Sequence, residues 1–128
     1  MPPAHPMISI PAPTNDVALV LGEQVFVRGS LEYPGEVVLH GEVQGGLGAE
    51  RIFVARTGLA TGTIVASDLV VEGRIENAAI FAERIVLRRG SVVIGEMYHF
   101  DLVLEAGCLF EGKSRRHPNP TSLAPAEI

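Results

Sequence analysis

Short apolar triplets recur along most of the chain. From residue 52 onward they begin about 16 or 17 residues apart, as Ile52-Phe53-Val54, Leu69-Val70-Val71, Ile85-Val86-Leu87 and Leu102-Val103-Leu104. Two earlier triplets extend the series to six, namely Leu19-Val20-Leu21 and Val37-Val38-Leu39. A repeat of this length is too short for a pair of helices, so it predicts a solenoid of short strands.

Each triplet is followed by a turn and then by two further apolar positions. The first of these is occupied by Phe26, Val43, Leu59, Ile75, Val92 and Leu109. The second is occupied by Leu31, Leu47, Ile64, Ile80 and Met97, with Ser114 in the last row. Because side chains alternate along an extended chain, we expect these positions and the outer two residues of each triplet to point inward. Three extended segments per row, with glycine at the bends, predict a triangular β-solenoid of about six rungs.

The composition agrees with a single all-β domain of this kind. The chain has 128 residues, no tryptophan and few aromatic side chains. A narrow column of stacked Val, Ile and Leu does not need large aromatic residues. The single cysteine, Cys108, excludes an internal disulfide, and we expect a small, partly buried residue at a corner.

Charge and hydropathy bear on partners and compartment. The formal net charge is −5, which argues against nonspecific nucleic-acid binding. No apolar run is long enough to cross a bilayer, and the N-terminus lacks the pattern of a secretory signal. The sequence therefore predicts a cytoplasmic protein.

The predicted domain covers residues 17–114, between two tails of different composition. Residues 1–16 contain five of the nine prolines, and the repeat stops after residue 114. We expect both 1–16 and 115–128 to be disordered, because proline cannot donate to a sheet ladder. A short apolar stretch at residues 7–10 leaves two alternatives open: a weak membrane contact, or a strand that folds back on the domain.

Catalytic motifs are missing from the repeat. The sequence has no phosphate-binding Gly-rich loop, no dinucleotide fingerprint and no nucleophile elbow. The enzymatic alternative is a trimeric β-solenoid acyltransferase or a zinc enzyme resembling carbonic anhydrase. Zinc needs three converging ligands, whereas only His40 and His99 lie within the repeat, several rungs apart. We expect both histidines to be exposed, and we predict no catalytic residue, cofactor or metal.

The rungs resemble those of the bactofilin family. The resemblance rests on residues 37–45, on residues 69–75 and on the closing stretch at residues 102–113, with its Phe-Glu-Gly sequence. It implies a right-handed parallel β-helix and a non-enzymatic bacterial cytoskeletal scaffold for cell-shape or cell-wall machinery. The scaffold would polymerise end to end, without nucleotide, into nonpolar filaments.

The resemblance also implies where such a protein acts. The partners would be further copies of the chain, together with cell-wall enzymes or inner-membrane proteins, and the location would be the inner face of the cell membrane. Some members carry an N-terminal membrane-targeting motif that begins Met-Phe or similar. This chain begins Met1-Pro2-Pro3, so the sequence leaves direct membrane binding open.

Open ends of a solenoid expose unpaired backbone groups, which invite pairing with another chain. We predict that the N-terminal contact is made by Leu19, Leu21 and Phe26, and the C-terminal contact by Leu104, Leu109 and Phe110. In this reading Phe110 follows an inward position and points outward as an edge or anchor residue. The alternative for all six is plain core packing in the terminal rungs.

Overall fold

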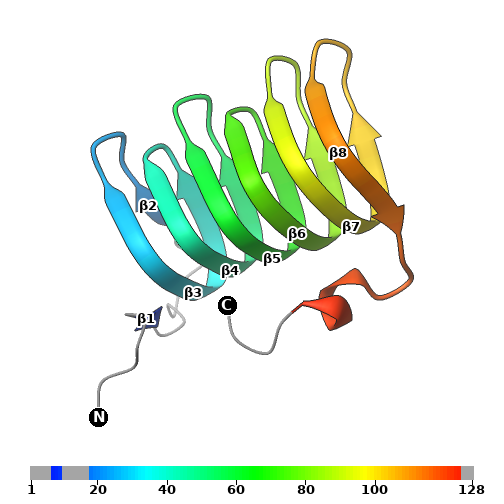
Figure 1. The fold of residues 1–128 in the computed structure, drawn as a ribbon. Helices are drawn as coiled ribbons and strands as arrows, with labels where there is room; N and C mark the ends of the chain where they lie inside the picture. Colours follow the sequence, from blue (N-terminus) through cyan, green and yellow to red (C-terminus); the bar gives the residue numbers. More distant parts are fainter. Residues whose placement is uncertain (1–6, 10–17, 125–128) are drawn as a thin grey trace.

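A computed structural model describes residues 7–9 and 18–124, and most of this range winds as a parallel β-solenoid (Figure 1). The main strands are β2 (Leu19–Leu21), β3 (Phe26–Leu39), β4 (Glu42–Val54), β5 (Leu59–Val71), β6 (Arg74–Leu87), β7 (Val92–Leu104) and β8 (Leu109–Arg116). Each of them from β2 to β7 pairs in parallel with the strand of the next turn. The predicted fold class, an all-β solenoid of about six rungs, is confirmed.

Each long strand bends around three faces of the solenoid. We call the face made by the six apolar triplets the first face. The second face begins where the strands resume after a turn, at residues 26–28, 42–44, 59–61, 74–76, 92–94 and 109–111. The third face is made by residues 30–33, 46–49, 63–66, 79–82, 96–99 and 113–116. One rung therefore consists of three short extended segments, as the repeat predicted.

The turns between the first and second faces come in two lengths. Long turns of four residues occupy 22–25, 55–58, 88–91 and 105–108, whereas short turns of two residues occupy 40–41 and 72–73. In each long turn the fourth N–H donates to the first carbonyl, as from Gly58 N to Ala55 O at 2.8 Å. Short and long turns alternate over the first five rungs, which explains the uneven period of the sequence.

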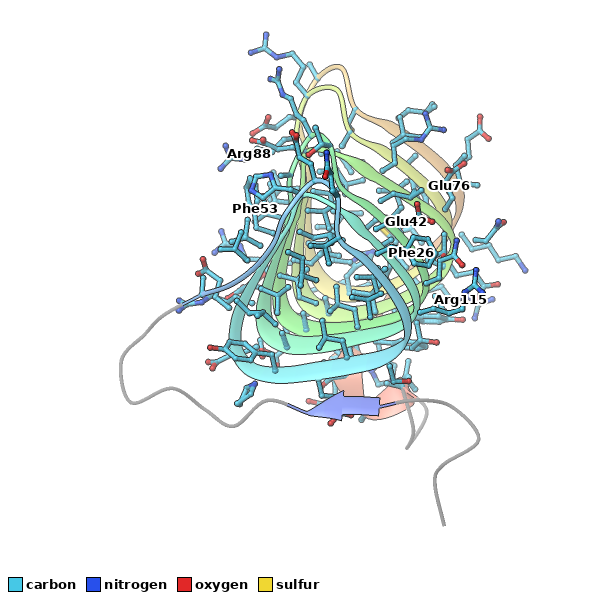
Figure 2. All side chains as sticks on the ribbon, turned by 90° about the vertical axis from the view of Figure 1, so that its left-hand side faces the viewer. Phe26, Glu42, Phe53, Glu76, Arg88 and Arg115 are labelled. Atoms are coloured by element: carbon cyan, nitrogen blue, oxygen red, sulfur yellow. The ribbon has the colours of Figure 1, made fainter. Side chains whose placement is uncertain are left out.

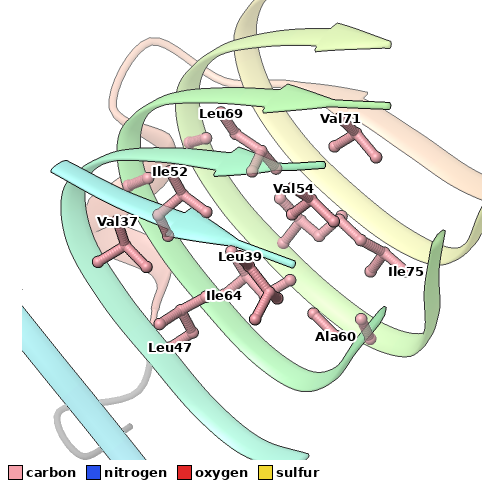
Figure 3. Close-up of a cluster of buried hydrophobic side chains, with 14 of the residues drawn as sticks. Val37, Leu39, Leu47, Ile52, Val54, Ala60, Ile64, Leu69, Val71 and Ile75 are labelled. Carbon is pink, nitrogen blue, oxygen red and sulfur yellow. The ribbon is translucent and has the colours of Figure 1, made fainter. Parts of the chain in front are cut away.

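The core is a set of stacked columns inside the solenoid (Figure 3). The first face contributes two columns, of which one runs Leu19, Val37, Ile52, Leu69, Ile85 and Leu102. Leu47, Ile64 and Ile80 stack in a third column on the third face, and all three are buried. Like residues therefore lie on like residues at the parallel strand spacing of about 4.8 Å.

The inward position of the second face is not the one predicted for every rung. The buried column there runs Val27, Val43, Ala60, Ile75, Val93 and Phe110. Val43 and Ile75 are predicted correctly. Phe26, Leu59, Val92 and Leu109 lie one residue earlier than the inward position and point outward. The error falls on the rungs that follow a long turn, where two adjacent residues are both apolar.

A column of small residues forms the corner between the second and third faces. Gly29, Gly45, Gly62, Gly95 and Gly112 lie in register there, all with positive φ. A Cβ on Gly62 would overlap the carbonyl oxygen of Gly45 on the preceding rung. Strand β6 has no glycine at this corner and uses Asn77, with φ 49°, and Ala78 at a register shift. The chain therefore turns here through conformations that glycine adopts without strain.

Parts of the predicted tails are ordered. Strand β1 (Met7–Ser9) pairs in parallel with Ser30–Glu32 of β3, which matches the alternative in which the N-terminal segment folds back. Strand β8 runs on to Arg116, past the predicted domain end at residue 114, and a 3-10 helix, η1 (Pro120–Leu123), follows. The predicted disorder of residues 1–6, 10–16 and 125–128 lies outside the described residues.

Candidate polymerisation interface

The C-terminal end of the solenoid leaves its hydrophobic columns open. Among the described residues, no strand pairs with the outer edge of β8 or with the outer edge of Leu102–Leu104 in β7. Leu104 stacks on Leu87, which is fully buried, yet Leu104 itself is 51% exposed. Leu104 therefore has the side chain and position of a core residue without the rung that would cover it.

The neighbouring residues at this end exchange the orientations predicted for them. Phe110 stacks on Val93 and packs against the core, so it points inward and forms the end of a column. Leu109 points outward and is 47% exposed at the rim. The open apolar surface of the C-terminal end thus consists of Leu102, Leu104 and Phe110, with Leu109 beside it.

Polar side chains end the columns of the third face at the same end. Ser114 stacks on Met97, and its Oγ lies 2.6 Å from Nε2 of His99. His99 is only 7% exposed, which contradicts the prediction of an exposed histidine. It lies two residues after the inward Met97, so strand alternation turns it inward as well.

The environment of His99 disfavours its charged form. Burial lowers the pKa of its imidazole, and the positive charge of Arg116 acts in the same direction, against the raising effects of the Phe100 backbone and of Asp101. Its Nδ1 is buried and has no hydrogen-bond partner. The C-terminal end therefore combines open apolar columns with a buried, neutral histidine.

The N-terminal end is less open than the C-terminal end on the first face. Leu19 and Leu21 begin the two columns of the first face, yet Leu21 is only 9% exposed and Leu19 is partly buried against the core. Phe26 points outward at the rim and is 50% exposed, with the Arg28 guanidinium 5.5 Å from its ring centroid. Figure 2 looks along the solenoid from this end and shows Phe26 on the outside. The inward residue of the second face is Val27.

The two ends differ in what covers the third face. At the N-terminal end β1 pairs with the outer edge of β3, and Leu31 of that stretch is only 2% exposed. Up to residue 124, the C-terminal segment lies against the third face and not over its own end. Its helix η1 contacts β5, β6 and β7 instead, below the third face in the view of Figure 1. Among the described residues, one end therefore carries an added strand, whereas no strand pairs with the other.

Other candidate chemistry is not brought together within residues 7–9 and 18–124. No three His, Cys, Asp or Glu side chains there converge in a way that could hold a metal ion. His40 is half-buried beside the turn of the second rung, far along the solenoid from His99. Cys108 is partly buried against the core at a corner, as predicted. In the same part of the chain no helix is long and apolar enough to cross a membrane.

These features define a class of protein: a parallel β-solenoid whose columns, among the described residues, are open at the C-terminal end. Comparison of the sequence with known protein families identifies the family within this class. Residues 19–115 match the family described as "Bactofilin: Polymer-forming cytoskeletal". The chain belongs to the bactofilin family, which is a family of polymer-forming cytoskeletal proteins. The resemblance stated from the rung sequences is thereby confirmed.

A solved structure agrees with this assignment. The chain is similar to the structure described as "Atomic structure of the cytoskeletal bactofilin BacA revealed by solid-state NMR", with 28% sequence identity and a TM-score of 0.55. The match covers 79% of this chain and 97% of that chain. No curated protein matches the sequence. The solenoid of this chain therefore corresponds to nearly the whole of the solved bactofilin.

Proposed function

We propose that the protein assembles end to end, without nucleotide, into nonpolar filaments. The observation that carries the proposal is the exposure of Leu104, which continues a buried column and has no rung above it. A second solenoid stacked on this end would bury the columns and pair the free strand edges. Membership of a polymer-forming family supports the same conclusion.

The C-terminal contact would consist of Leu104 and Phe110 at its centre and Leu109 at its rim. Leu104 and Phe110 end two neighbouring inward columns, so they would meet the matching columns of the partner. Leu109 points outward and would close the edge of the contact against water. The orientation of Phe110 makes it a core-like contact residue and not an outward anchor.

The N-terminal contact would be formed by Leu19 and Leu21, which begin the two columns of the first face, with the exposed Phe26 at the rim. If each end meets its own kind, the two contacts are both isologous and alternate along the filament. A filament built from alternating isologous contacts has no polarity. The strand β1 would then lie within the N-terminal contact, because it occupies the edge of the third face there.

Leu104→Arg tests the C-terminal contact. A charged side chain at the end of a column would be buried without a partner on stacking, so we expect filaments to disappear. Negative-stain electron microscopy in buffer without nucleotide or metal is the readout, and circular dichroism checks that the β fold remains. Wild-type-like filaments from folded Leu104→Arg protein would refute the assignment of this end.

Leu59→Arg is the matched control for that experiment. Leu59 points outward in the middle of the solenoid, and Arg74 occupies the same outward column on the next rung. The column therefore accepts arginine, and we expect both fold and filaments to survive. A loss of filaments in both variants would show that added charge alone prevents assembly.

In the cell we propose that the filament is a cytoplasmic scaffold that positions cell-shape or cell-wall machinery at the inner face of the membrane. Family membership supports this role. A fluorescent fusion should give discrete structures at the cell boundary that Leu104→Arg disperses. If a variant that forms no filaments in vitro kept its localisation, the position of the protein in the cell would not depend on polymerisation.

A further inference from the structure

The outer surface of the first face carries a continuous apolar stripe along the whole solenoid. The middle residue of each triplet points outward, and the six lie in register from rung to rung. The stripe consists of Val20, Val38, Phe53, Val70, Val86 and Val103. Figure 2 shows Phe53 projecting from the side of the solenoid opposite Phe26, Glu42 and Glu76. Outward columns of the second face, by contrast, include charged or polar residues such as Arg28, Gln44, Thr61 and Glu111.

A column of charges borders this stripe, and its sign changes on every rung. It lies one outward position before the stripe, and we call it the charge ladder. The ladder consists of Glu36, Arg51, Asp68, Arg84 and Asp101, paired in register along the face. Neighbours of opposite sign approach each other within the chain, as Arg51 Nε and Glu36 Oε2 do at 3.6 Å.

We propose that the first face is a lateral interface on which a second copy of this chain packs face to face, with its solenoid axis antiparallel. In that arrangement the first rung of one copy lies over the sixth of the other, the second over the fifth and the third over the fourth. Glu36 then faces Arg84, and Arg51 faces Asp68, each twice in the pair. Asp101 faces Ala18, which is uncharged.

The same charges oppose a parallel arrangement. A twofold axis along the solenoid would place the ladder of one copy over the residues that follow the triplets of the other. Those residues on the last three rungs are Glu72, Arg88 and Glu105. Asp68 would face Glu72, Arg84 would face Arg88, and Asp101 would face Glu105. Like charges would meet on three successive rungs, whereas the antiparallel arrangement opposes Glu72, Arg88 and Glu105 with Ala55, His40 and Gly22.

The apolar contact fits the antiparallel arrangement as well. Its centre lies between the third and fourth rungs, where Phe53 of each copy faces Val70 of the other. A large aromatic side chain therefore meets a small aliphatic one at the position where binding energy usually concentrates. Phe53, the largest side chain of the stripe, therefore does not face Phe53 of the other copy.

The size of the face sets how strong one such contact is. Six rungs at about 4.8 Å and five residues at about 3.3 Å give about 29 Å by 17 Å, or about 490 Å² per copy. The total of about 1,000 Å² is near the lower limit for a specific interface. A single pair would be weak, and repetition along two neighbouring filaments would make it strong. The interface is separate from the ends, so it does not require the proposed end-to-end contact.

Site-specific cross-linking distinguishes the arrangements. In a Cys108→Ser background, Val38→Cys and Val86→Cys are prepared as full-length chains with tags of different size, and a short bismaleimide is added. We expect a heterodimer from the mixture and no dimer from either variant alone, because second-rung residues of antiparallel partners lie about three rungs, or about 14 Å, apart along the axis. A Val38→Cys homodimer would overturn the proposal in favour of a parallel pair.

Two further variants complete the test. Phe53→Glu should abolish the heterodimer, whereas Thr61→Glu, a half-buried outward position of the second face, should leave it unchanged. The mixture is also cross-linked in the Leu104→Arg background, where a surviving heterodimer shows that lateral pairing is independent of the ends. No cross-link in any mixture would overturn the proposal and leave the face to a membrane or to another protein.

Discussion

At the scale of single residues, one column of glycines forms the tight corner of every rung except that of β6. Gly45, Gly62 and Gly95 have φ values of 125°, 104° and 148°, and the site of a Cβ on each is occupied by the carbonyl oxygen of the rung before. Two constraints therefore act on the same atom: the backbone conformation and the close approach of a neighbouring strand. The triplet pattern does not identify this column, because these glycines lie at a second bend and not at the turn that follows each triplet.

Gly62→Ala should strongly destabilise the protein. The new Cβ would require both a strained φ and a displacement of the Gly45 carbonyl, and strain of the first kind alone costs about 1–3 kcal/mol. Urea denaturation measures the loss as a lower midpoint. Gly22→Ala is the control, since nothing lies within 4 Å of its Cβ position, and we expect a change within about 0.5 kcal/mol. Equal losses in the two variants would contradict the role of the corner.

His99 should make stability depend on pH. Burial lowers its pKa in the folded state below the unfolded value of about 6.5, so the unfolded chain binds a proton that the folded chain does not. The contribution of His99 to the free energy of unfolding is therefore highest at neutral pH, falls as the pH drops through about 6.5 and levels off below the folded pKa. Urea midpoints between pH 8 and pH 5, measured in the Leu104→Arg background to avoid filaments, should fall less in His99→Gln. Identical pH profiles would contradict a neutral buried histidine.

At the scale of elements, the first face could be predicted in full and the second only in part. On the first face the apolar triplets recur regularly, so the outer two residues of each triplet can be assigned to the core without ambiguity. On the second face a short turn is followed by a charged residue and then an apolar one, as in Glu42-Val43, and alternation decides between them. After a long turn both residues are apolar, as in Leu59-Ala60, and the pattern does not show which one points inward.

The inner column at the far edge of the third face escaped prediction for a different reason. Tyr33 pairs with Ala49 on the first two rungs, and Ala66, Ala82 and His99 lie in register on the next three. Alanine and histidine give no clear hydrophobic signal. Strand alternation from Met97 was the signal that would have placed His99 inside.

The C-terminal segment is an element whose position no repeat could indicate. Phe81 points outward from the third face, yet it is only 7% exposed. The Tyr98 ring stacks on it at 5.1 Å between centroids, and η1, with its buried Pro120, contacts the same strand. The segment therefore serves as a cover for the outside of the third face.

Deleting residues 117–128 should lower stability without preventing assembly. Loss of the cover exposes part of Phe81, which we expect to cost about 1–2 kcal/mol. Thermal unfolding measures the stability, and electron microscopy shows whether filaments form. We expect filaments to form because the deletion leaves the strands at both ends of the solenoid unchanged. Loss of filaments from the folded truncated protein would place the C-terminal segment in the assembly contact.

At the scale of the whole molecule, the candidate interface follows from where the repeat begins and ends. All six predicted residues lie in the terminal rungs, although Phe26, Leu109 and Phe110 differ from the predicted orientations. The sequence could not show that β1 joins one end only, because pairing of a distant three-residue segment depends on an exposed strand edge and not on a periodic pattern.

The strand β1 has a consequence for how a filament would grow. It already satisfies backbone groups along one third of the N-terminal end, whereas the described residues leave the corresponding edge at the C-terminal end free. Fewer groups remain to be paired at the first end, so the two joints of a nonpolar filament would differ in strength. Chains would couple first through their bare ends, and the unit added to a growing filament would be a dimer. Mass photometry during dilution should then show filaments shortening to dimers before single chains appear.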